Sequence, residues 1–265
     1  MILQTALLAL VAGLTWAVLR GGWRLNMARL DMRPKGEALV LGILALGAAI
    51  WFFGLAGGIA LTLAVAVHEF GHVAAFRVAG HPDATFRLIP FLGGVASSRK
   101  SPASDLHDWY ITIMGPGICL VLMCAAWLLL LTPLGSMPFL GSVLYFLAVF
   151  NGALNFFNLL PIYPLDGGRI FWTVFGAYAP QIAKFILLGM TGLIALAAVA
   201  SFSIFLFILA LFSFQALGQI GHGRRRMRAM THGQAAMAAA AWLLMLAAFG
   251  LGSFGFILQY IGPLG

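Results

Sequence analysis

Long apolar stretches, interrupted by few charges, constrain this chain more than any other feature of its sequence. Of the 265 residues, 62% are hydrophobic and only 8% are charged, whereas a soluble domain carries about 25% charged residues. So few charges cannot cover the surface of a water-soluble globule, while about 20 consecutive apolar residues suffice for a membrane-spanning helix. The composition therefore excludes a soluble fold and predicts an all-α polytopic membrane protein.

About eight stretches are long and apolar enough to be transmembrane helices. The apolar run 36–80 is too long for one crossing, and the glycines at 54–58 predict a turn that divides it. A second long run, 182–221, is expected to break near residues 201–203. The expected helices cover residues 1–19, 37–53, 59–79, 108–131, 139–160, the two halves of 182–221, and 234–260.

The basic residues indicate a topology. Eight helices would place the connections alternately on two sides of the membrane, and every Lys and Arg lies on one of these sides or at a helix end that faces it. By the positive-inside rule that side is cytoplasmic. The excess of 15 Lys and Arg over 7 Asp and Glu is therefore interpreted as a topology signal. The basic cluster at 224–228 is expected to contact anionic lipid headgroups rather than nucleic acid.

The third expected helix contains the sequence His68-Glu69-Phe70-Gly71-His72. Two histidines four residues apart lie on one face of a helix and can both bind a metal, and the glutamate beside them is placed to act on a metal-bound water. Each ionisable group inside a membrane helix costs about 2.5–3.5 kcal/mol on insertion scales, so its presence needs a reason. We favour a metal site over a polar cluster that only joins helices through hydrogen bonds.

A catalytic zinc takes three protein ligands and keeps a position open for water. Asp166 is a candidate third ligand, because the other Asp residues and the remaining His residues lie in polar connections. Taken alone, however, Asp166 is better explained as the N-cap of a short helix over 169–177. The residues by themselves therefore leave the third ligand open.

Two segments together resemble the site-2 protease family of intramembrane zinc metalloproteases. H-E-F-G-H at 68–72 fits the family's H-E-x-x-H, and F-N-L-L-P-I-Y-P-L-D-G-G at 157–168 fits its N-x-x-P-x-x-P-L-D-G signature. The resemblance implies one Zn²⁺ per chain, held by His68, His72 and Asp166. It also implies that Glu69 is the general base, and that Asn158 is a hydrogen-bond donor near the reacting carbonyl.

Weaker matches extend the resemblance. Residues 87–96 are similar to the family's membrane-edge β-hairpin, and residues 114–117 to its Gly-Pro helix motif. The resemblance covers residues 37–221, which we expect to form a six-helix metalloprotease core. Residues 1–36 are expected to be a transmembrane helix with a basic cytoplasmic connection, and residues 222–265 a basic cytoplasmic loop with a last transmembrane helix. We expect a minimal member of the family, without a PDZ or CBS domain.

We therefore expect a zinc metalloendopeptidase that hydrolyses a peptide bond in or near the transmembrane segment of a membrane protein. Its role would be regulated intramembrane proteolysis or the clearance of signal-peptide remnants. Two alternatives remain, namely a catalytically inactive zinc-binding membrane scaffold and a metal transporter that uses His68, His72 and Asp166. Glu69 distinguishes them, because only a protease needs a glutamate that does not bind the metal.

The expected partners are the transmembrane substrate and membrane lipids, without nucleic acid, and the sequence does not determine the oligomeric state. The edge of the hairpin around Gly93 and Gly94 could pair with an extended substrate strand, or these residues could merely form a turn. The expected location is a bacterial inner membrane, with the active site toward the cytoplasmic side.

Overall fold

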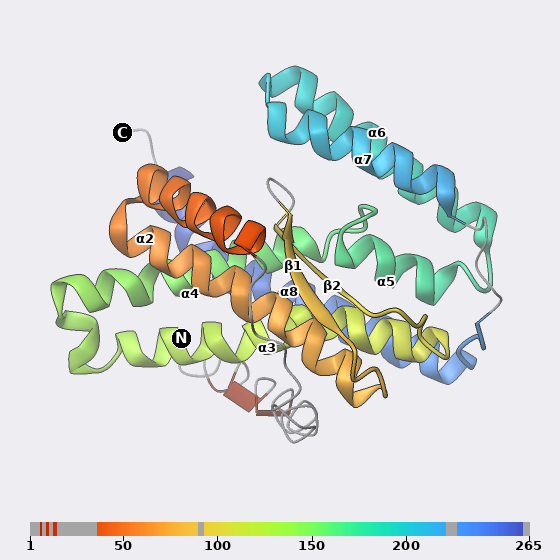
Figure 1. Ribbon diagram of the computed structural model, residues 1–265, viewed down its shortest axis with the longest axis horizontal. Helices are drawn as coiled ribbons and strands as arrows, with labels where there is room; N and C mark the ends of the chain where they lie inside the picture. The colour runs from red at the N-terminus through yellow and green to blue at the C-terminus, as the bar shows by residue number, and fades with distance from the viewer. Residues whose placement is uncertain are drawn as a thin grey trace. The chain divides into compact units, whose positions relative to one another are not determined.

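The computed structural model describes residues 36–89, 93–220 and 227–261, together with residues 6, 9, 10, 13 and 14. Most of the expected helix at 1–19, and the basic residues at 224–226, lie outside this part of the chain. Figure 1 shows the elements. They are α2 (Gly36–Val78), β1 (Thr85–Ile89), β2 (Gly93–Ser97), α3 (Asp105–Leu130), the 3₁₀ helix η2 (Pro133–Ser136), α4 (Pro138–Asn158), α5 (Asp166–Phe175), α6 (Pro180–Ser201), α7 (Ile204–Gln219) and α8 (His232–Ile261).

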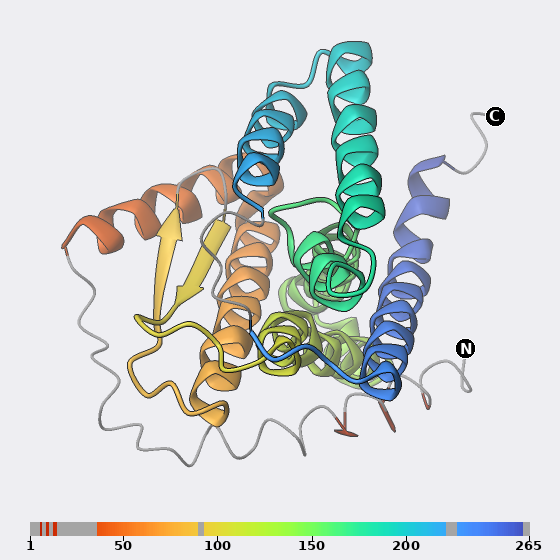
Figure 2. The same cartoon turned by 90° about the vertical axis from the view of Figure 1, so that its right-hand side faces the viewer.

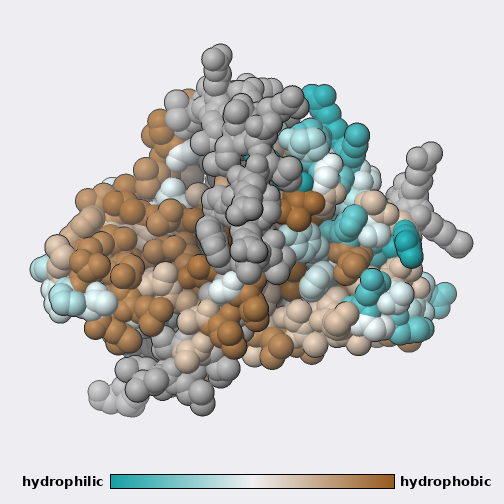
Figure 3. Space-filling model, turned by 90° about the horizontal axis from the view of Figure 1, so that it is seen from below, coloured by the Kyte–Doolittle hydropathy of each residue, from teal (hydrophilic) through white to brown (hydrophobic). Residues whose placement is uncertain are grey.

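Within the described residues, five helices are long and apolar enough to cross a membrane, and the chain is an integral membrane protein. These spans are Gly42–Val78, Asp105–Leu130, Pro138–Asn158, Pro180–Ser201 and His232–Ser253. Large apolar side chains such as Trp51 and Phe185 are exposed on the helices, and Figure 3 shows apolar residues spread widely over one face. Such a surface suits hydrocarbon rather than water. The number of eight crossings stays a prediction.

α2 consists of two helical arms that meet at Gly54. This residue has φ 71° and ψ 174°, a backbone conformation that is almost restricted to glycine. The bend is tight, because the Cα atom of Ile50 lies 2.7 Å from the position that a Cβ on Gly58 would occupy. Figure 2 shows the two arms inclined to each other. The expected break in the run 36–80 is therefore confirmed.

Residues 1–100, 114–156 and 247–265 form one compact unit. In its core the second arm of α2 packs against α3 and α4 through alanines, among them Ala60, Ala64 and Ala148. Small side chains let helices approach closely, which favours van der Waals packing where no hydrophobic driving force is available.

The two strands of this unit pair antiparallel, with a register that runs from Thr85 opposite Ser97 to Ile89 opposite Gly93. They pack against α2, as Figures 1 and 2 both show. Just before β1, the Asp83 carboxylate accepts hydrogen bonds from the backbone N–H of Arg99 (2.8 Å) and from the hydroxyl of Ser98 (3.0 Å), which follow β2. The strands thus lie where the hairpin was expected, and their location at a membrane edge stays a prediction.

Residues 101–113 and 157–246 form a second compact unit. Here α6 and α7 lie side by side, joined by a turn in which Phe202 adopts a left-handed conformation (φ 50°) and Ser203 caps α7. A buried 2.6 Å hydrogen bond joins the hydroxyls of Thr191 and Ser213 across the pair. The expected break near 201–203 is confirmed.

Replacing Gly54 with alanine is expected to lower the free energy of unfolding by about 1–3 kcal/mol, because a Cβ disfavours the backbone conformation at the bend. Gly47→Ala on the same arm is the control: nothing lies within 4 Å of the added Cβ, and alanine favours the helix. Thermal unfolding in detergent micelles, followed by tryptophan fluorescence, compares the variants. Equal midpoints for both would show that Gly54 does not fix the bend.

Candidate metal centre

His68 and His72 lie one turn apart on the second arm of α2, and both imidazoles are buried. Their Nε2 atoms are 3.1 Å apart, and their rings meet edge to face. Two nitrogen ligands of a tetrahedral zinc, each at about 2.0–2.1 Å from the metal, stand about 3.3 Å apart. The two histidines therefore fit the binding of a single zinc ion. Glu69, next to His68 in the sequence, is buried with them.

The other ring nitrogen of His68 has a partner on α4. Nδ1 of His68 lies 2.8 Å from Oδ1 of Asn155, and Asn155 is fully buried. Histidines that bind metals usually hydrogen-bond a protein oxygen through their second nitrogen, so this contact supports the metal interpretation. Asn155 is not among the residues that the sequence indicated. The available signal was its spacing of four from Asn151, which places two asparagines on one face of an apolar helix.

Glycines bring α2 and α3 together beside His72. A Cβ on Gly115 would overlap the imidazole of His72, and a Cβ on Gly71 would overlap the carbonyl oxygen of Met114. Glycine at these two positions is therefore required by the close approach of backbone and ring. The Gly-Pro segment at 114–117 accordingly has a packing role at the metal-binding histidine pair.

The structure describes Asp166 and Asn158 in the second unit. Asp166 is the first residue of α5, and the N-cap is Leu165. The expectation that Asp166 itself caps a helix over 169–177 is therefore wrong, because the helix already begins at Asp166. Asn158 ends α4 and is half-buried. The roles of Asp166 as a metal ligand and of Asn158 as a hydrogen-bond donor stay predictions.

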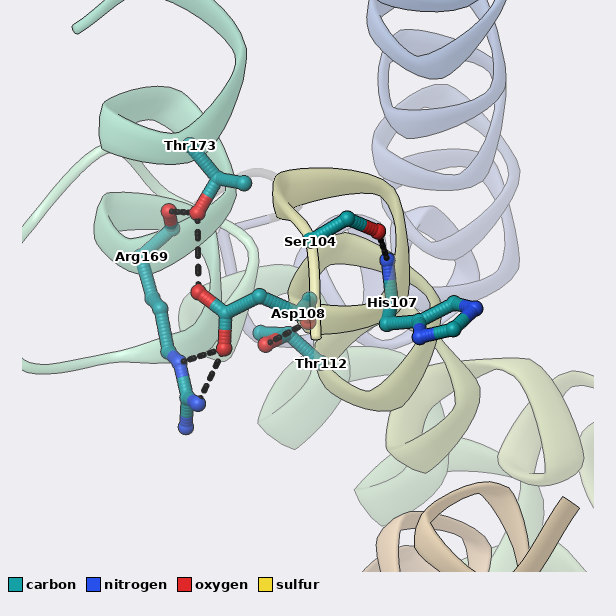
Figure 4. A network of polar contacts seen from close by, with 6 residues as sticks. All are labelled: Ser104, His107, Asp108, Thr112, Arg169 and Thr173. Atoms are coloured by element: carbon teal, nitrogen blue, oxygen red, sulfur yellow. Dashed lines mark hydrogen bonds and ion pairs between the residues drawn. The ribbon is translucent and has the colours of Figure 1, made fainter. Parts of the chain in front are cut away.

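An ion pair between a buried carboxylate and a partly exposed arginine joins α5 to the start of α3 (Figure 4). The Asp108 carboxylate is fully buried. Its Oδ1 accepts from Nε (3.1 Å) and Nη2 of Arg169, and its Oδ2 accepts from the hydroxyl of Thr173 (3.2 Å). Arg169 and Thr173 are one turn apart on α5, so a single carboxylate fixes both the position and the rotation of the helix that begins with Asp166. The sequence had placed Asp108 among the polar connections and did not indicate this pairing.

The sequence of the chain is similar to those of zinc-dependent proteases. Residues 138–199 match Peptidase family M50. A protein of Synechocystis sp. named as a candidate zinc metalloprotease is 33% identical over 128 residues, which make up 47% of this chain and 32% of the relative. A zinc metalloprotease of Methanocaldococcus jannaschii is 34% identical over 113 residues, or 42% of this chain and 32% of the relative. The chain spans about a third of the length of these two relatives.

Among solved structures, a site-2 protease from Methanocaldococcus jannaschii is similar over 73% of this chain and 91% of its own, with 24% identity and a TM-score of 0.46. The resemblance predicted from the sequence is confirmed by the family match and by the named relatives.

Asp108→Ala is expected to lower the free energy of unfolding by about 1–3 kcal/mol, because Arg169 and Thr173 lose their shared acceptor. Lys184→Ala, which removes an exposed charge from α6, is the control and should leave stability unchanged. Chemical unfolding in micelles, monitored by tryptophan fluorescence, measures both. A loss no larger than that of Lys184→Ala would mean that the ion pair contributes nothing to the attachment of α5.

Proposed function

We propose, from the similarity of the chain to the M50 peptidases, that it is a zinc metalloendopeptidase acting on a peptide bond in or beside the transmembrane segment of a membrane protein. The observation that carries this proposal is the pair of buried imidazoles on α2, whose Nε2 atoms are spaced for one zinc ion. This pair lies in a helix long and apolar enough to cross a membrane. A soluble substrate would have no access to such a site, whereas a membrane segment would.

His68, His72 and Asp166 would hold the zinc ion. Two imidazoles and one carboxylate form a donor set typical of catalytic zinc, which leaves a fourth position for water. The carboxylate comes from the first residue of α5, a helix whose position the Asp108–Arg169 ion pair fixes. The resemblance of residues 157–168 to the family signature supports the choice of Asp166.

The chemistry follows from the residues around that set. When bound, zinc lowers the pKa of a coordinated water to about 7 and makes a nucleophile available at neutral pH. Glu69 would accept a proton from the attacking water and donate a proton to the leaving amine. The side-chain amide of Asn158 would donate a hydrogen bond to the oxygen on which negative charge develops. A transmembrane substrate must unwind locally first, because its own helix protects its peptide bonds.

The proposal also covers the membrane in which the chain lies and the class of its substrate. The placement of Lys and Arg supports an active site toward the cytoplasmic side of the membrane, and the membrane we propose is a bacterial inner membrane. The substrate would be either a membrane-tethered regulator, released by regulated intramembrane proteolysis, or a remnant signal peptide. Membrane lipids would contact the apolar helices.

Glu69→Gln is expected to lower kcat for cleavage of a reporter transmembrane substrate by at least about 10²-fold, since the side chain can no longer accept a proton. Zinc content should not change, because Glu69 is not a ligand. Glu37→Gln is the matched control, because Glu37 is the only other glutamate in the chain. Cleavage assays in micelles and metal analysis of the same samples give both quantities.

The same experiment separates the alternatives. Unchanged cleavage by Glu69→Gln, or no cleavage by either protein, would contradict the protease. Zinc bound without any cleavage would favour the inactive scaffold. Metal movement across proteoliposomes that depends on His68 and His72 but not on Glu69 would favour the transporter.

We further infer that an extended substrate segment adds to the β1–β2 pair as a third strand beside β2. Neighbouring residues of a strand direct their N–H groups to opposite edges, so one of Val95 and Ala96 faces β1 and the other faces outward. Val95→Pro and Ala96→Pro are therefore a matched pair. The outward-facing proline should reduce cleavage without loss of zinc or stability, because it removes a donor from the free edge. Full cleavage by both variants would contradict the addition of the substrate as a third strand.

A further inference from the structure

We propose that Asn155 is a positioning residue that fixes the tautomer of His68, so that the lone pair of Nε2 is directed toward the metal. The inference rests on the proposed zinc site and assigns a role to a residue outside the motifs that carry the family resemblance. It is derived from two hydrogen bonds of a single side chain.

The first hydrogen bond fixes which way the Asn155 amide points. Its Nδ2 lies 2.8 Å from the backbone carbonyl oxygen of Asn151 on the same helix. A carbonyl oxygen can only accept, so the NH₂ end of the amide must face it. The oxygen end of the amide is thereby turned toward His68.

The second hydrogen bond then fixes the imidazole. Oδ1 of Asn155 lies 2.8 Å from Nδ1 of His68, and an amide oxygen can only accept. Nδ1 must therefore carry the hydrogen, and the neutral ring has its lone pair on Nε2. This Nε2 atom is the one that lies 3.1 Å from Nε2 of His72, at the point where the two rings would share a metal.

Burial makes this arrangement hard to replace. Asn155 is 0% exposed and His68 only 4% exposed, so bulk water does not compete for either hydrogen bond. The acceptor for Nδ2 is a helix carbonyl, which is held in place by the backbone. His68 is thus oriented by α4 before any metal arrives, and removing a hydrogen-bond partner of this kind typically weakens metal binding by about 10–100-fold.

Asn151 supplies a matched control. It lies one turn from Asn155 on α4, is also 0% exposed, and donates from its own Nδ2 to the carbonyl oxygen of Leu147 at 2.8 Å. Its Oδ1 has no hydrogen-bond partner among the described residues. Substitution of either asparagine therefore removes a buried amide from the same helix, but of the two hydrogen bonds described here only that of Asn155 reaches His68.

The test compares Asn155→Leu with Asn151→Leu in the full chain, purified in micelles, by competition for zinc against a chelator. Zinc affinity should fall by about 10–100-fold for Asn155→Leu and remain unchanged for Asn151→Leu. Asn155→Asp, which keeps an acceptor oxygen, should recover most of the affinity. Equal affinities for the two leucine variants would overturn the role of Asn155.

A second measurement covers the case in which Asn155→Leu does not fold. In metal-free wild-type protein, ¹⁵N NMR of labelled histidine should show His68 with hydrogen on Nδ1, and hydrogen on Nε2 alone would overturn the proposal. The results that would overturn the role of Asn155 can be told apart from those that would overturn the proposed protease. A wild-type protein that binds no zinc would overturn the protease, whereas intact zinc binding and cleavage in Asn155→Leu would overturn only the positioning role.

Discussion

Hydrocarbon offers no hydrogen bonds, so a polar side chain inside a membrane helix must find its partner within the protein. Three polar contacts, each with at least one buried side chain, join helices in pairs. His68 joins α2 to α4 through Asn155, Asp108 joins α3 to α5 through Arg169, and Thr191 joins α6 to α7 through Ser213. The apolar surfaces of these helices suit lipid as well as they suit one another, so the polar contacts specify which helices pair.

The helical framework could be predicted from the sequence, because its determinants are local. Apolar length and turn residues placed α3, α4 and α8 within three residues of their observed bounds. The breaks at Gly54 and near Phe202 followed from runs too long for one crossing. The histidine pair on α2 was equally local, since a spacing of four residues always places two side chains on one face of a helix.

Residues that act through distant partners could not be found in this way. Asn155 contacts a histidine 87 positions earlier in the chain, and Asp108 an arginine 61 positions later. No short-range pattern encodes either distance. The expectation that Asp166 caps a helix was wrong for a different reason. Its position before two glycines and an apolar helix is typical of an N-cap. The structure instead gives the N-cap to Leu165, one residue earlier, so the carboxylate does not have the capping role expected of it.

The two histidines of α2 are held by different kinds of force. His68 is held by a directional hydrogen bond, whereas His72 rests against the bare backbone of Gly115, where any side chain would displace it. The first restraint selects a chemical form of the ring, and the second only limits the space in which the ring can move. Most of the conformational entropy of both side chains is thus given up when the protein folds rather than when a ligand arrives. A cation would therefore meet a pair that is already preorganised, with only the tautomer of His72 left to adjust.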